Sequence, residues 1–281
     1  MSESQAGRVA LITGANTGIG YVTALELARQ GFHVFIACRS PERAEAAVAR
    51  MLHEAPDSRI ELLALDLSDL ASVRSCANEF LARDIPLSLL INNAGVSGSR
   101  GLTKSGFELA FGINHIGHFL LTQLLMPRLR AAAPSRIITV ASQAHRAARG
   151  IDWDAVRKRT HTRVAYTEYA VSKLANVLFN AELARQLNGS GITTCSLHPG
   201  VIASDIWRKI PWPVRPLIKL GMLSPEEGAA ATLYCALSPE TAAKTGLYYD
   251  GGRVSTPSRA GRDAALAAEL WKRSEEWVAN N

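Results

Sequence analysis

Tyr169 and Lys173 are the two residues whose types and spacing could do chemistry together. They lie four apart at the start of an apolar pattern typical of a helix, so the phenol and the ammonium should point to the same side. A free tyrosine titrates near about 10, and a fixed cation nearby lowers that pKa. The pair could then act as a general acid or base near neutral pH. The alternative is a tyrosine and a lysine that merely line a helix.

A glycine-rich turn near the N-terminus could bind a dinucleotide. An apolar strand is expected over residues 8–12, then the glycine-containing stretch 13–20, a helix over 21–30 and a second strand over 33–38. Glycines allow a tight turn and let a pyrophosphate approach the N–H groups at the helix start. The spacing G-x-x-x-G-x-G differs from the G-x-G-x-x-G fingerprint, but its position between a strand and a helix favours a dinucleotide site.

The end of the second strand bears on the choice of cofactor. Sites for NAD commonly place a carboxylate there, on the ribose 2′-hydroxyl, whereas this chain has none until Glu42. Arg39 can pair with a 2′-phosphate and Ser40 can donate to it, which favours NADP over NAD. The alternative is a surface arginine at a strand end.

Polar residues follow the other expected strands, over 60–65, 87–91, 136–140 and 192–197. Ligands of parallel sheets gather at the carboxyl ends of strands. Asp66 could accept from an adenine amino group or cap the next helix, and Ser142 could form a turn or bind a substrate oxygen. The side chains of Asn92 and Asn93 could tie neighbouring strand ends together.

One long helical segment, 106–130, contains a buried asparagine, Asn114, which needs hydrogen-bond partners. His115 and His118 lie near it. Because no cysteine or carboxylate is placed to complete a metal site, we interpret both histidines as structural and expect no metal.

Size and composition bound the function. The chain has 281 residues and is 47% hydrophobic, which suits one α/β domain with an ample core. The net charge of +6 is scattered, which argues against nucleic acid. The four widely spaced cysteines fit buried, reduced thiols. With a polar start, no signal peptide and no run of eighteen apolar residues, the sequence predicts a cytoplasmic protein without a transmembrane segment.

Two further segments have a distinct character. The stretch 206–216 is aromatic, apolar and proline-rich, and within about 203–223 it could form a lid over an apolar pocket, a rigid interface loop or a peripheral membrane contact. Residues 260–279 predict an amphipathic C-terminal helix.

Together these motifs resemble a family. Thr13-Gly-x-x-x-Gly18-x-Gly20, Asn92-Asn-Ala-Gly95, Asn114, Ser142, Tyr169-x-x-x-Lys173 and Pro199-Gly200 occur in one order, and the set is similar to the short-chain dehydrogenase/reductase family over nearly the whole chain. The stretches 14–20, 37–40, 114–122 and 172–179, with the long insert between Ser142 and Tyr169, resemble its retinol dehydrogenase-like branch.

The resemblance implies a single Rossmann-type doubly wound domain over residues 1–281, with a parallel sheet of about seven strands. Tyr169 would be the general acid or base, Lys173 would bind the nicotinamide ribose, Ser142 would polarise the substrate carbonyl and Asn114 would hold a proton-relaying water. The residues expected at the cofactor are Gly14, Asn16, Thr17, Gly18, Ile19, Gly20, Arg39, Ser40, Asp66, Leu67, Asn93, Ala94, Gly95, Tyr169, Lys173, Pro199, Gly200, Val201 and Ser204.

The activity implied is interconversion of an alcohol and a carbonyl on a small, apolar substrate with NADP(H), by a homodimer or homotetramer. Two rivals stay open: an NAD(H)-dependent enzyme of the same fold, and a non-catalytic NADP(H)-binding sensor or scaffold. Two departures matter. The chain lacks the N-terminal hydrophobic anchor of many relatives in that branch, and Ser204 stands where the family often has threonine.

Overall fold

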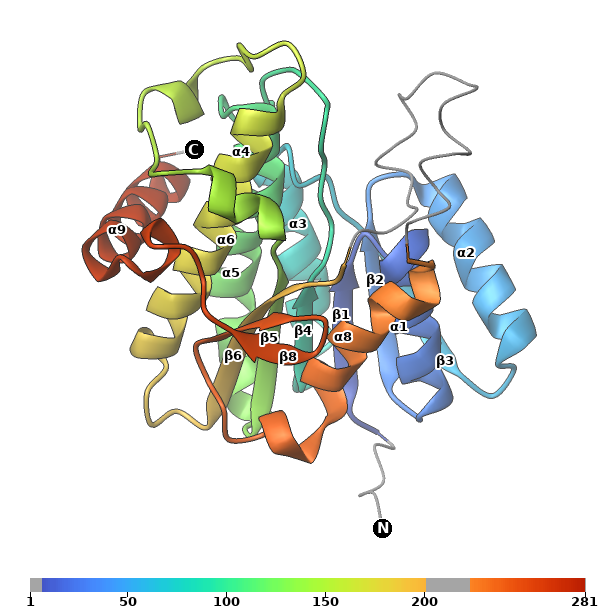
Figure 1. Ribbon diagram of the computed structural model, residues 1–281. Helices are drawn as coiled ribbons and strands as arrows, with labels where there is room; N and C mark the ends of the chain where they lie inside the picture. Colours follow the sequence, from blue (N-terminus) through green and yellow to red (C-terminus); the bar gives the residue numbers. More distant parts are fainter. Residues whose placement is uncertain (1–6, 201–222, 281) are drawn as a thin grey trace.

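The centre of the fold is a twisted sheet, seen in a computed structural model that describes residues 7–200 and 223–280 (Figure 1). Neighbouring strands are parallel except the last pair, β7 and β8, which are antiparallel. In spatial order the strands are β3 (Arg59–Ala64), β2 (His33–Cys38), β1 (Val9–Thr13), β4 (Leu89–Asn92), β5 (Ser135–Val140), β6 (Ile192–His198), β7 (Leu247–Asp250) and β8 (Arg253–Ser255).

The structure confirms the expected fold class but adds an eighth strand to the seven that were predicted. β7 and β8 are joined by Gly251 and Gly252, whose φ angles of 55° and 80° suit the two-residue turn of a hairpin. The strand was missed because β8 is three residues long and half-exposed, so it carries almost no apolar pattern.

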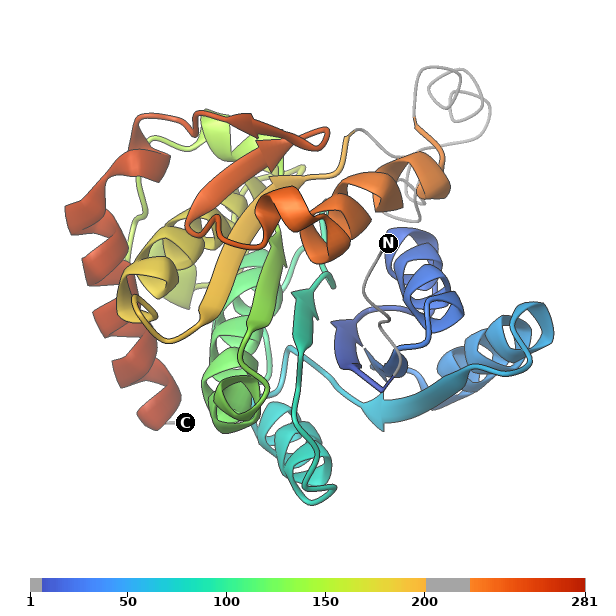
Figure 2. The ribbon, with the colours of Figure 1, turned by 90° about the horizontal axis from the view of Figure 1, so that it is seen from below.

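Helices cover both faces of the sheet, as the view in Figure 2 shows. One face carries α1 (Gly18–Arg29), α2 (Pro41–Glu54) and α8 (Pro225–Leu237), and the other carries α3 (Leu70–Leu81), α5 (Gly117–Ala131), α6 (Tyr166–Gln186) and α9 (Ala264–Ala279). Two separate clusters of buried apolar side chains fill the two interfaces. The strands between them are buried on both faces, as parallel strands must be.

The chain reverses direction across the sheet between β1 and β4. From β1 it winds outward to β2 and β3, then returns to β4 on the other side of β1 and continues to β5 and β6. Ligands of doubly wound sheets bind at the carboxyl ends of the strands at this reversal. The fold therefore sets the loops after β1, β2, β4, β5 and β6 at one edge of the sheet.

The segment expected as one helix over 106–130 begins later and changes its winding. It starts at Leu109 with α4 (Leu109–Phe111), passes through a π-helical turn (Gly112–Ile116) and continues as α5. Gly106, with φ of 77°, turns the chain, and the Glu108 carboxylate caps the start by accepting from the Phe111 N–H. The π turn contains Asn114, and such turns occur often at functional positions.

Helix α6 begins at Tyr166, one turn before the expected start. Ala165 adopts the left-handed conformation, with φ of 54°, directly before the first turn. The Glu168 carboxylate accepts from the N–H groups of His161 and Thr162, which joins the long insert to the helix. Tyr169 is therefore already inside a formed helix.

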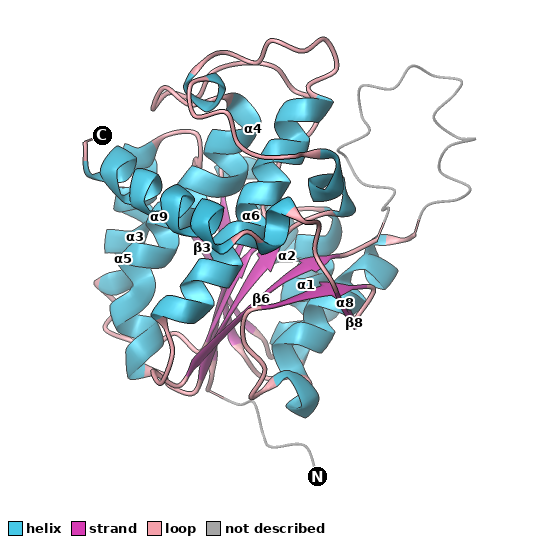
Figure 3. Ribbon diagram, turned by 60° about the vertical axis from the view of Figure 1, so that its left-hand side comes forward, coloured by secondary structure: helices cyan, strands magenta, loops and turns pink. Residues whose placement is uncertain are grey.

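The insert before α6 is mostly irregular, with two short 3-10 turns, η2 (Gln143–Ala147) and η3 (Ala155–Arg157). The C-terminal helix expected over 260–279 is divided into a 3-10 turn, η6 (Ala260–Arg262), and α9. A further 3-10 turn, η5 (Pro239–Thr241), follows α8. Figure 3 shows α9 beside α6. The lid expected at about 203–223 lies outside the described residues except for Leu223, as do Val201 and Ser204.

Candidate functional site

The glycine-rich turn after β1 packs tightly beneath the end of β4. A Cβ on Gly14 would lie 2.9 Å from Ala94, and a Cβ on Gly20 would lie 2.5 Å from Nδ2 of Asn93. Gly14 also needs its φ of 68°. Glycine at both positions is thus required by the approach of two backbone segments.

The ends of β1 and β4 are joined by side chains. The buried Thr13 hydroxyl accepts from the N–H groups of Asn93 and Ala94, each at 3.0 Å, and Nδ2 of Asn93 donates to the Thr13 carbonyl at 2.8 Å. Asn92 donates to the Thr122 hydroxyl on α5 at 3.0 Å. The prediction that these asparagines tie neighbouring strand ends together is confirmed for Asn93, whereas Asn92 joins β4 to α5.

The start of α1 fits the pyrophosphate of a dinucleotide. Thr17 stands at the N-cap and its side chain caps no N–H group of the first turn. A Cβ built on Gly18, whose φ is 58°, meets no atom within 4 Å. The space toward which a Gly18 side chain would point is thus open, at the positive end of the helix dipole. Asn16 and Ile19 flank this opening, and both are half-buried.

The carboxyl end of β2 lies at the same edge of the sheet as the glycine-rich turn. Arg39 is exposed, and within the part of the chain that the structure describes it forms no ion pair. Ser40 is the N-cap residue of α2, but its hydroxyl makes no capping hydrogen bond. A guanidinium and a hydroxyl are therefore available where β2 ends, and the nearest following carboxylate, Glu42, belongs to the first turn of α2.

Asp66 follows β3 and does not cap the next helix. Asp69 takes that role by accepting from the Ala71 N–H at 3.0 Å. Burial opposes ionisation of Asp66, but hydrogen bonds from Ser68 and the nearby Lys104 ammonium hold its pKa below the ordinary value. The adjacent Leu67 is buried against Gly117, where a Cβ would lie 2.7 Å from the Leu67 carbonyl oxygen. A contact of Asp66 with an adenine stays a prediction.

Tyr169 and Lys173 lie on one face of α6, as their spacing predicts. The Lys173 nitrogen is 5.8 Å from the centre of the Tyr169 ring. Burial raises the pKa of Tyr169, and a hydrogen bond with the Ser142 hydroxyl opposes that rise. Ser142 lies at the start of η2, where its hydroxyl also accepts from the Ala144 N–H at 3.2 Å. The serine is thus a turn residue and a neighbour of the phenol at once.

The expected depression of the Tyr169 pKa by Lys173 is absent, and the reason lies with the lysine. Its side chain is buried, and burial lowers the pKa of Lys173 to about 7. The nitrogen donates at 2.7 Å to the carbonyl oxygen of Val140, the last residue of β5. An ammonium that is half-neutral near pH 7 and directed at the strand stabilises a phenolate weakly.

A second donor to the same carbonyl was missed from the sequence. Nδ2 of Asn176 donates to the Val140 oxygen at 3.2 Å, so α6 holds the end of β5 through two side chains. Its place three residues after Lys173, on the same face of the helix, was the available signal.

Asn114 makes three hydrogen bonds with its side chain. Oδ1 accepts from the Val96 N–H at 2.8 Å, and Nδ2 donates to the Val96 carbonyl at 3.0 Å and to the Ser172 hydroxyl at 2.9 Å. A Cβ on Gly95 would lie 3.3 Å from this Oδ1 and 3.5 Å from the Lys173 nitrogen. Asn114, Gly95 and Lys173 therefore meet, whereas the water-holding role of Asn114 stays a prediction.

The histidines beside Asn114 are structural, as predicted. Nε2 of His118 is 2.8 Å from the Thr13 hydroxyl, and Nε2 of His115 is 3.0 Å from the Ser274 hydroxyl on α9. Burial lowers the pKa of His115 to about 3 and that of His118 to about 4. Over 7–200 and 223–280, no three His, Cys, Asp or Glu side chains gather as metal ligands would.

Pro199 and Gly200 follow β6 at the same edge of the sheet, where Gly200 takes a φ of 97°. The structure therefore brings the predicted residues after β1, β2, β3, β4, β5 and β6 to one edge, with the face of α6 beside them. Val201 and Ser204 alone among the predicted site residues lie outside the described part.

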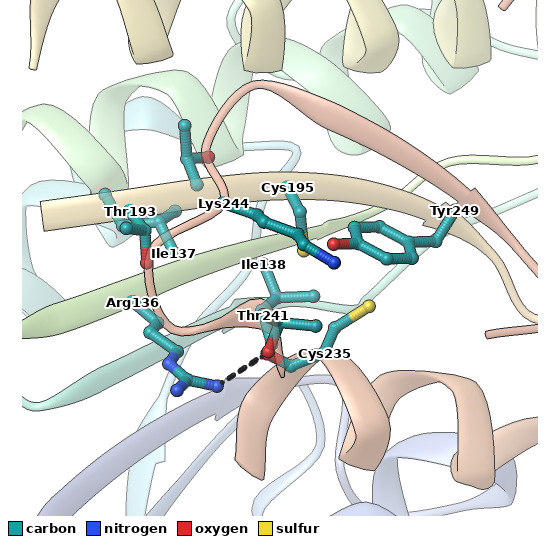
Figure 4. A pocket seen from close by; sticks show the side chains of 10 residues that line it. Arg136, Ile137, Ile138, Thr193, Cys195, Cys235, Thr241, Lys244 and Tyr249 are labelled. Atoms are coloured by element: carbon teal, nitrogen blue, oxygen red, sulfur yellow. Dashed lines mark hydrogen bonds between the residues drawn. The ribbon is translucent and has the colours of Figure 1, made fainter. Parts of the chain in front are cut away.

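A small cavity elsewhere does not belong to this site. It has a volume of about 10 Å³, room for one water, and lies between β5, β6, β7 and α8, where Arg136 donates to the Thr241 hydroxyl (Figure 4). Cys195 and Cys235 line it, and all four cysteines of the chain are free and buried, as expected. A hydrogen bond with Cys235, together with burial, raises the pKa of Cys195, so its thiol is a poor nucleophile.

Comparison with known proteins extends these observations. The family model described as short chain dehydrogenase matches residues 8–153. "Dehydrogenase/reductase SDR family member 13" of Bos taurus is 45% identical over 279 residues, which cover 96% of this chain and 73% of that protein. "Retinol dehydrogenase 13" of Homo sapiens is 41% identical over 281 residues, covering 97% of this chain and 85% of the relative.

Solved structures agree with the fold. An uncharacterised protein from Mycobacterium Paratuberculosis is 36% identical, with a TM-score of 0.79 over 98% of this chain and 95% of its own. A Pseudomonas aeruginosa protein, described as an "RhlG/NADP active-site complex", is 30% identical, with a TM-score of 0.71 over 88% of this chain and 95% of its own.

The predicted cytoplasmic location is wrong. The prediction rested on a polar start, no recognisable signal peptide and no long uninterrupted apolar run, and the similarity to retinol dehydrogenase 13 and SDR family member 13 contradicts it. By length and composition, one helical stretch among the described residues, Leu109–Ala131, could cross a membrane, although 78% of its most apolar window is buried in the fold. Hydropathy alone did not identify it because polar residues interrupt the stretch.

The family match over the first half, the identity over nearly the whole chain and the agreement in fold lead to one conclusion. This chain belongs to the short-chain dehydrogenase family and is similar to its retinol dehydrogenases, which makes it an oxidoreductase acting between alcohols and carbonyls.

Proposed function

We propose that this protein is an NADP(H)-dependent oxidoreductase that interconverts an alcohol and an aldehyde or ketone on an apolar substrate, with Tyr169 as the acid and base. The observation that supports this most directly is the meeting of Tyr169, Ser142 and Lys173 near Gly95, at the carboxyl ends of the strands. A nicotinamide cofactor supplies or accepts the hydride when bound.

The residues that would hold the cofactor lie at the strand ends. The uncapped start of α1 would take the pyrophosphate, and Arg39 with Ser40 would take a ribose 2′-phosphate. Lys173 would bind the nicotinamide ribose hydroxyls. The open guanidinium at the end of β2, with no carboxylate before Glu42, favours NADP over NAD.

The proton chemistry follows from the environment of the phenol. Because burial raises the pKa of Tyr169, its hydroxyl carries a proton at neutral pH and can donate it to a carbonyl oxygen during reduction. In oxidation the phenol oxygen takes the proton back from the alcohol. The Ser142 hydroxyl lies beside the phenol and would donate a hydrogen bond to the same substrate oxygen, which places and polarises the carbonyl.

Replacing Tyr169 by Phe tests the assignment. Turnover of aldehydes with NADPH should fall about 10²- to 10⁴-fold, the usual contribution of a positioned acid, while NADPH affinity changes less than about twofold. Steady-state kinetics and the fluorescence of bound NADPH measure the two quantities separately.

Tyr166→Phe is the matched control, because this tyrosine lies in the first turn of the same helix but is 51% exposed. It should leave turnover unchanged. Full activity in Tyr169→Phe would contradict the assignment. Tight NADPH binding without turnover, over a panel of alcohols and carbonyls graded by size and polarity, would support the sensor instead.

The cofactor preference has its own test in Arg39→Ala. Loss of charge-assisted hydrogen bonds to a 2′-phosphate should weaken NADPH binding about 10- to 100-fold and leave NADH binding within about twofold. Arg50→Ala removes an exposed cation from α2 that stacks over the Tyr21 ring, and it should change neither affinity. An equal loss for both cofactors in Arg39→Ala would favour the NAD(H)-dependent alternative.

A further inference from the structure

The turn η2, which begins directly after Ser142, is attached to the C-terminal part of the chain by three of its side chains. Nε2 of Gln143 donates to Asp250 at 2.8 Å, and the Arg146 guanidinium donates to the Thr256 carbonyl at 2.8 Å. Between them, Nε2 of His145 accepts from the N–H of Ser258 at 3.1 Å. Among these three side chains only His145 is fully buried.

The partners of His145 fix which nitrogen carries its proton. An N–H group can only donate, so Nε2, facing the Ser258 N–H, must present its lone pair. The proton is then on Nδ1, which donates to the Ser142 carbonyl oxygen at 2.6 Å. The ring is therefore a neutral bridge from the backbone of Ser142 to the backbone of Ser258.

The surroundings of the ring support the neutral form. Burial lowers the pKa of His145 and the Arg146 cation lowers it further, while the hydrogen bond to the Ser142 carbonyl and the carboxylate of Asp250 oppose them. The edge of the ring meets Tyr248, with centroids 5.0 Å apart. A second proton on Nε2 would face the Ser258 N–H donor and break the bridge.

We propose that His145 is a positioning residue that sets the Ser142 hydroxyl for the reaction by holding the carbonyl of the same residue against the C-terminal segment. This inference rests on the role of Ser142 in the proposed function. The Ser258 end of the bridge is itself anchored, because the Ser258 hydroxyl accepts from the Gly261 N–H at 3.1 Å. Gly261 in turn lies against α6, where a Cβ would be 3.2 Å from Val177.

Through this chain of contacts, His145 fixes the position of Ser142 relative to α6, the helix that carries Tyr169. On the other side of Ser142, α6 already holds the Val140 carbonyl through Lys173 and Asn176. The short turn is fixed at both ends relative to one helix, and the distance from serine hydroxyl to phenol depends on both attachments.

Two replacements of His145 test its two hydrogen bonds, to Ser142 and to Ser258, separately. In His145→Asn the amide NH₂ stands near Nδ1 and can still donate to Ser142, whereas in His145→Gln the amide oxygen reaches toward Ser258 and the bond to Ser142 is lost. We expect kcat to fall about 10- to 100-fold in His145→Gln, the scale of a misplaced catalytic group, and less than about threefold in His145→Asn. NADPH affinity should stay within about twofold in both.

A double-mutant cycle distinguishes positioning from a general structural role. In a Ser142→Ala background, which is slow itself, adding His145→Gln should cost no further activity if the histidine acts only through the serine. Arg146→Ala, which removes an exposed bond to the same segment, should leave kcat within about twofold. A ¹⁵N spectrum of the labelled wild-type protein should show His145 protonated at Nδ1 and unprotonated at Nε2.

Three outcomes would overturn the inference while leaving the proposed function intact. They are a wild-type kcat in His145→Gln, an equal loss of kcat in the two histidine variants, and additive effects of Ser142→Ala and His145→Gln in the double-mutant cycle. A protein that binds NADPH without any turnover, or a fully active Ser142→Ala variant, would instead contradict the proposed function, and the inference with it.

Discussion

Desolvation sets the protonation of the two central side chains in opposite senses. Burial raises the pKa of the Tyr169 phenol and lowers that of the Lys173 ammonium to about 7. Both groups are thereby moved toward their neutral forms. A neutral phenol can donate a proton, which is the form that the proposed role of Tyr169 in carbonyl reduction requires.

The pKa of Lys173 makes stability depend on pH. Unfolded lysine titrates near about 10.4, so between about pH 7 and that value the unfolded chain binds more protons than the folded one. Stability should then rise with pH in this window, by up to about 1.4 kcal/mol per unit from this group. From pH 7.5 to 9 the wild type should gain about 2 kcal/mol relative to Lys173→Met, measured by urea unfolding without cofactor.

The difference between the two proteins isolates Lys173 from other titrating groups. Lys272→Met removes an exposed lysine from α9 and should follow the pH profile of the wild type. Parallel profiles for wild type and Lys173→Met would show that the buried lysine stays protonated.

The position of the proposed reactive residues on one helix face could be predicted from the sequence, but their interactions could not. Spacing predicts that Tyr169 and Lys173 share a helix face, and the strand-end motifs predict one crevice. The direction of the shift in the Tyr169 pKa depends on burial and on the neighbouring Ser142 hydroxyl, which no sequence pattern reveals. His145 and Asn176 were missed because their roles come from partners distant in the sequence, Ser258 on one side and Val140 on the other.

At the scale of elements, α6 has two different faces. One presents Tyr169, Lys173 and Asn176 to the end of β5, while another receives α9, where the Phe179 and Trp271 rings stack 5.9 Å apart. Leu270 of α9 is 1% exposed and belongs to the same core. The packing of α9 on α6 therefore helps to hold in place the helix that carries Tyr169.

Leu270→Ala should lower the free energy of unfolding by about 2–5 kcal/mol, because truncation of a fully buried leucine leaves a cavity as well as losing contacts. Lys272→Ala, whose side chain is 78% exposed on the same helix, should change it by less than about 0.5 kcal/mol. Urea unfolding measures the free energy of unfolding of both variants, and equal effects of the two substitutions would show that α9 does not pack on the core.

Element boundaries differ from the predictions where side-chain hydrogen bonds act locally. The later start of the helical segment at Leu109 follows from the Glu108 cap, and the early start of α6 from Glu168 and Ala165; hydrophobic spacing carries no information about either. Strand β8 depends on the Gly251-Gly252 turn rather than on apolar residues. The long buried strands, in contrast, were all recognisable.

At the scale of the molecule, the strand order explains why motifs spread over nearly 190 residues, from Gly14 to Gly200, meet at one edge of the sheet. The family and the doubly wound fold could be predicted from these motifs in order. The location of the protein could not be predicted from the sequence, because attachment to a membrane does not require a long uninterrupted run of apolar residues. A homodimer or homotetramer stays a prediction.

The packing of α9 on α6 has a consequence for biosynthesis. Ribosomes release the chain from its N-terminus, so the glycine loop and all six central strands emerge before the last helix does. Until residues 264–279 leave the exit tunnel, the aromatic side of α6 faces water. A nascent chain could thus accommodate its nucleotide early, yet complete the support of α6 only after α9 has emerged.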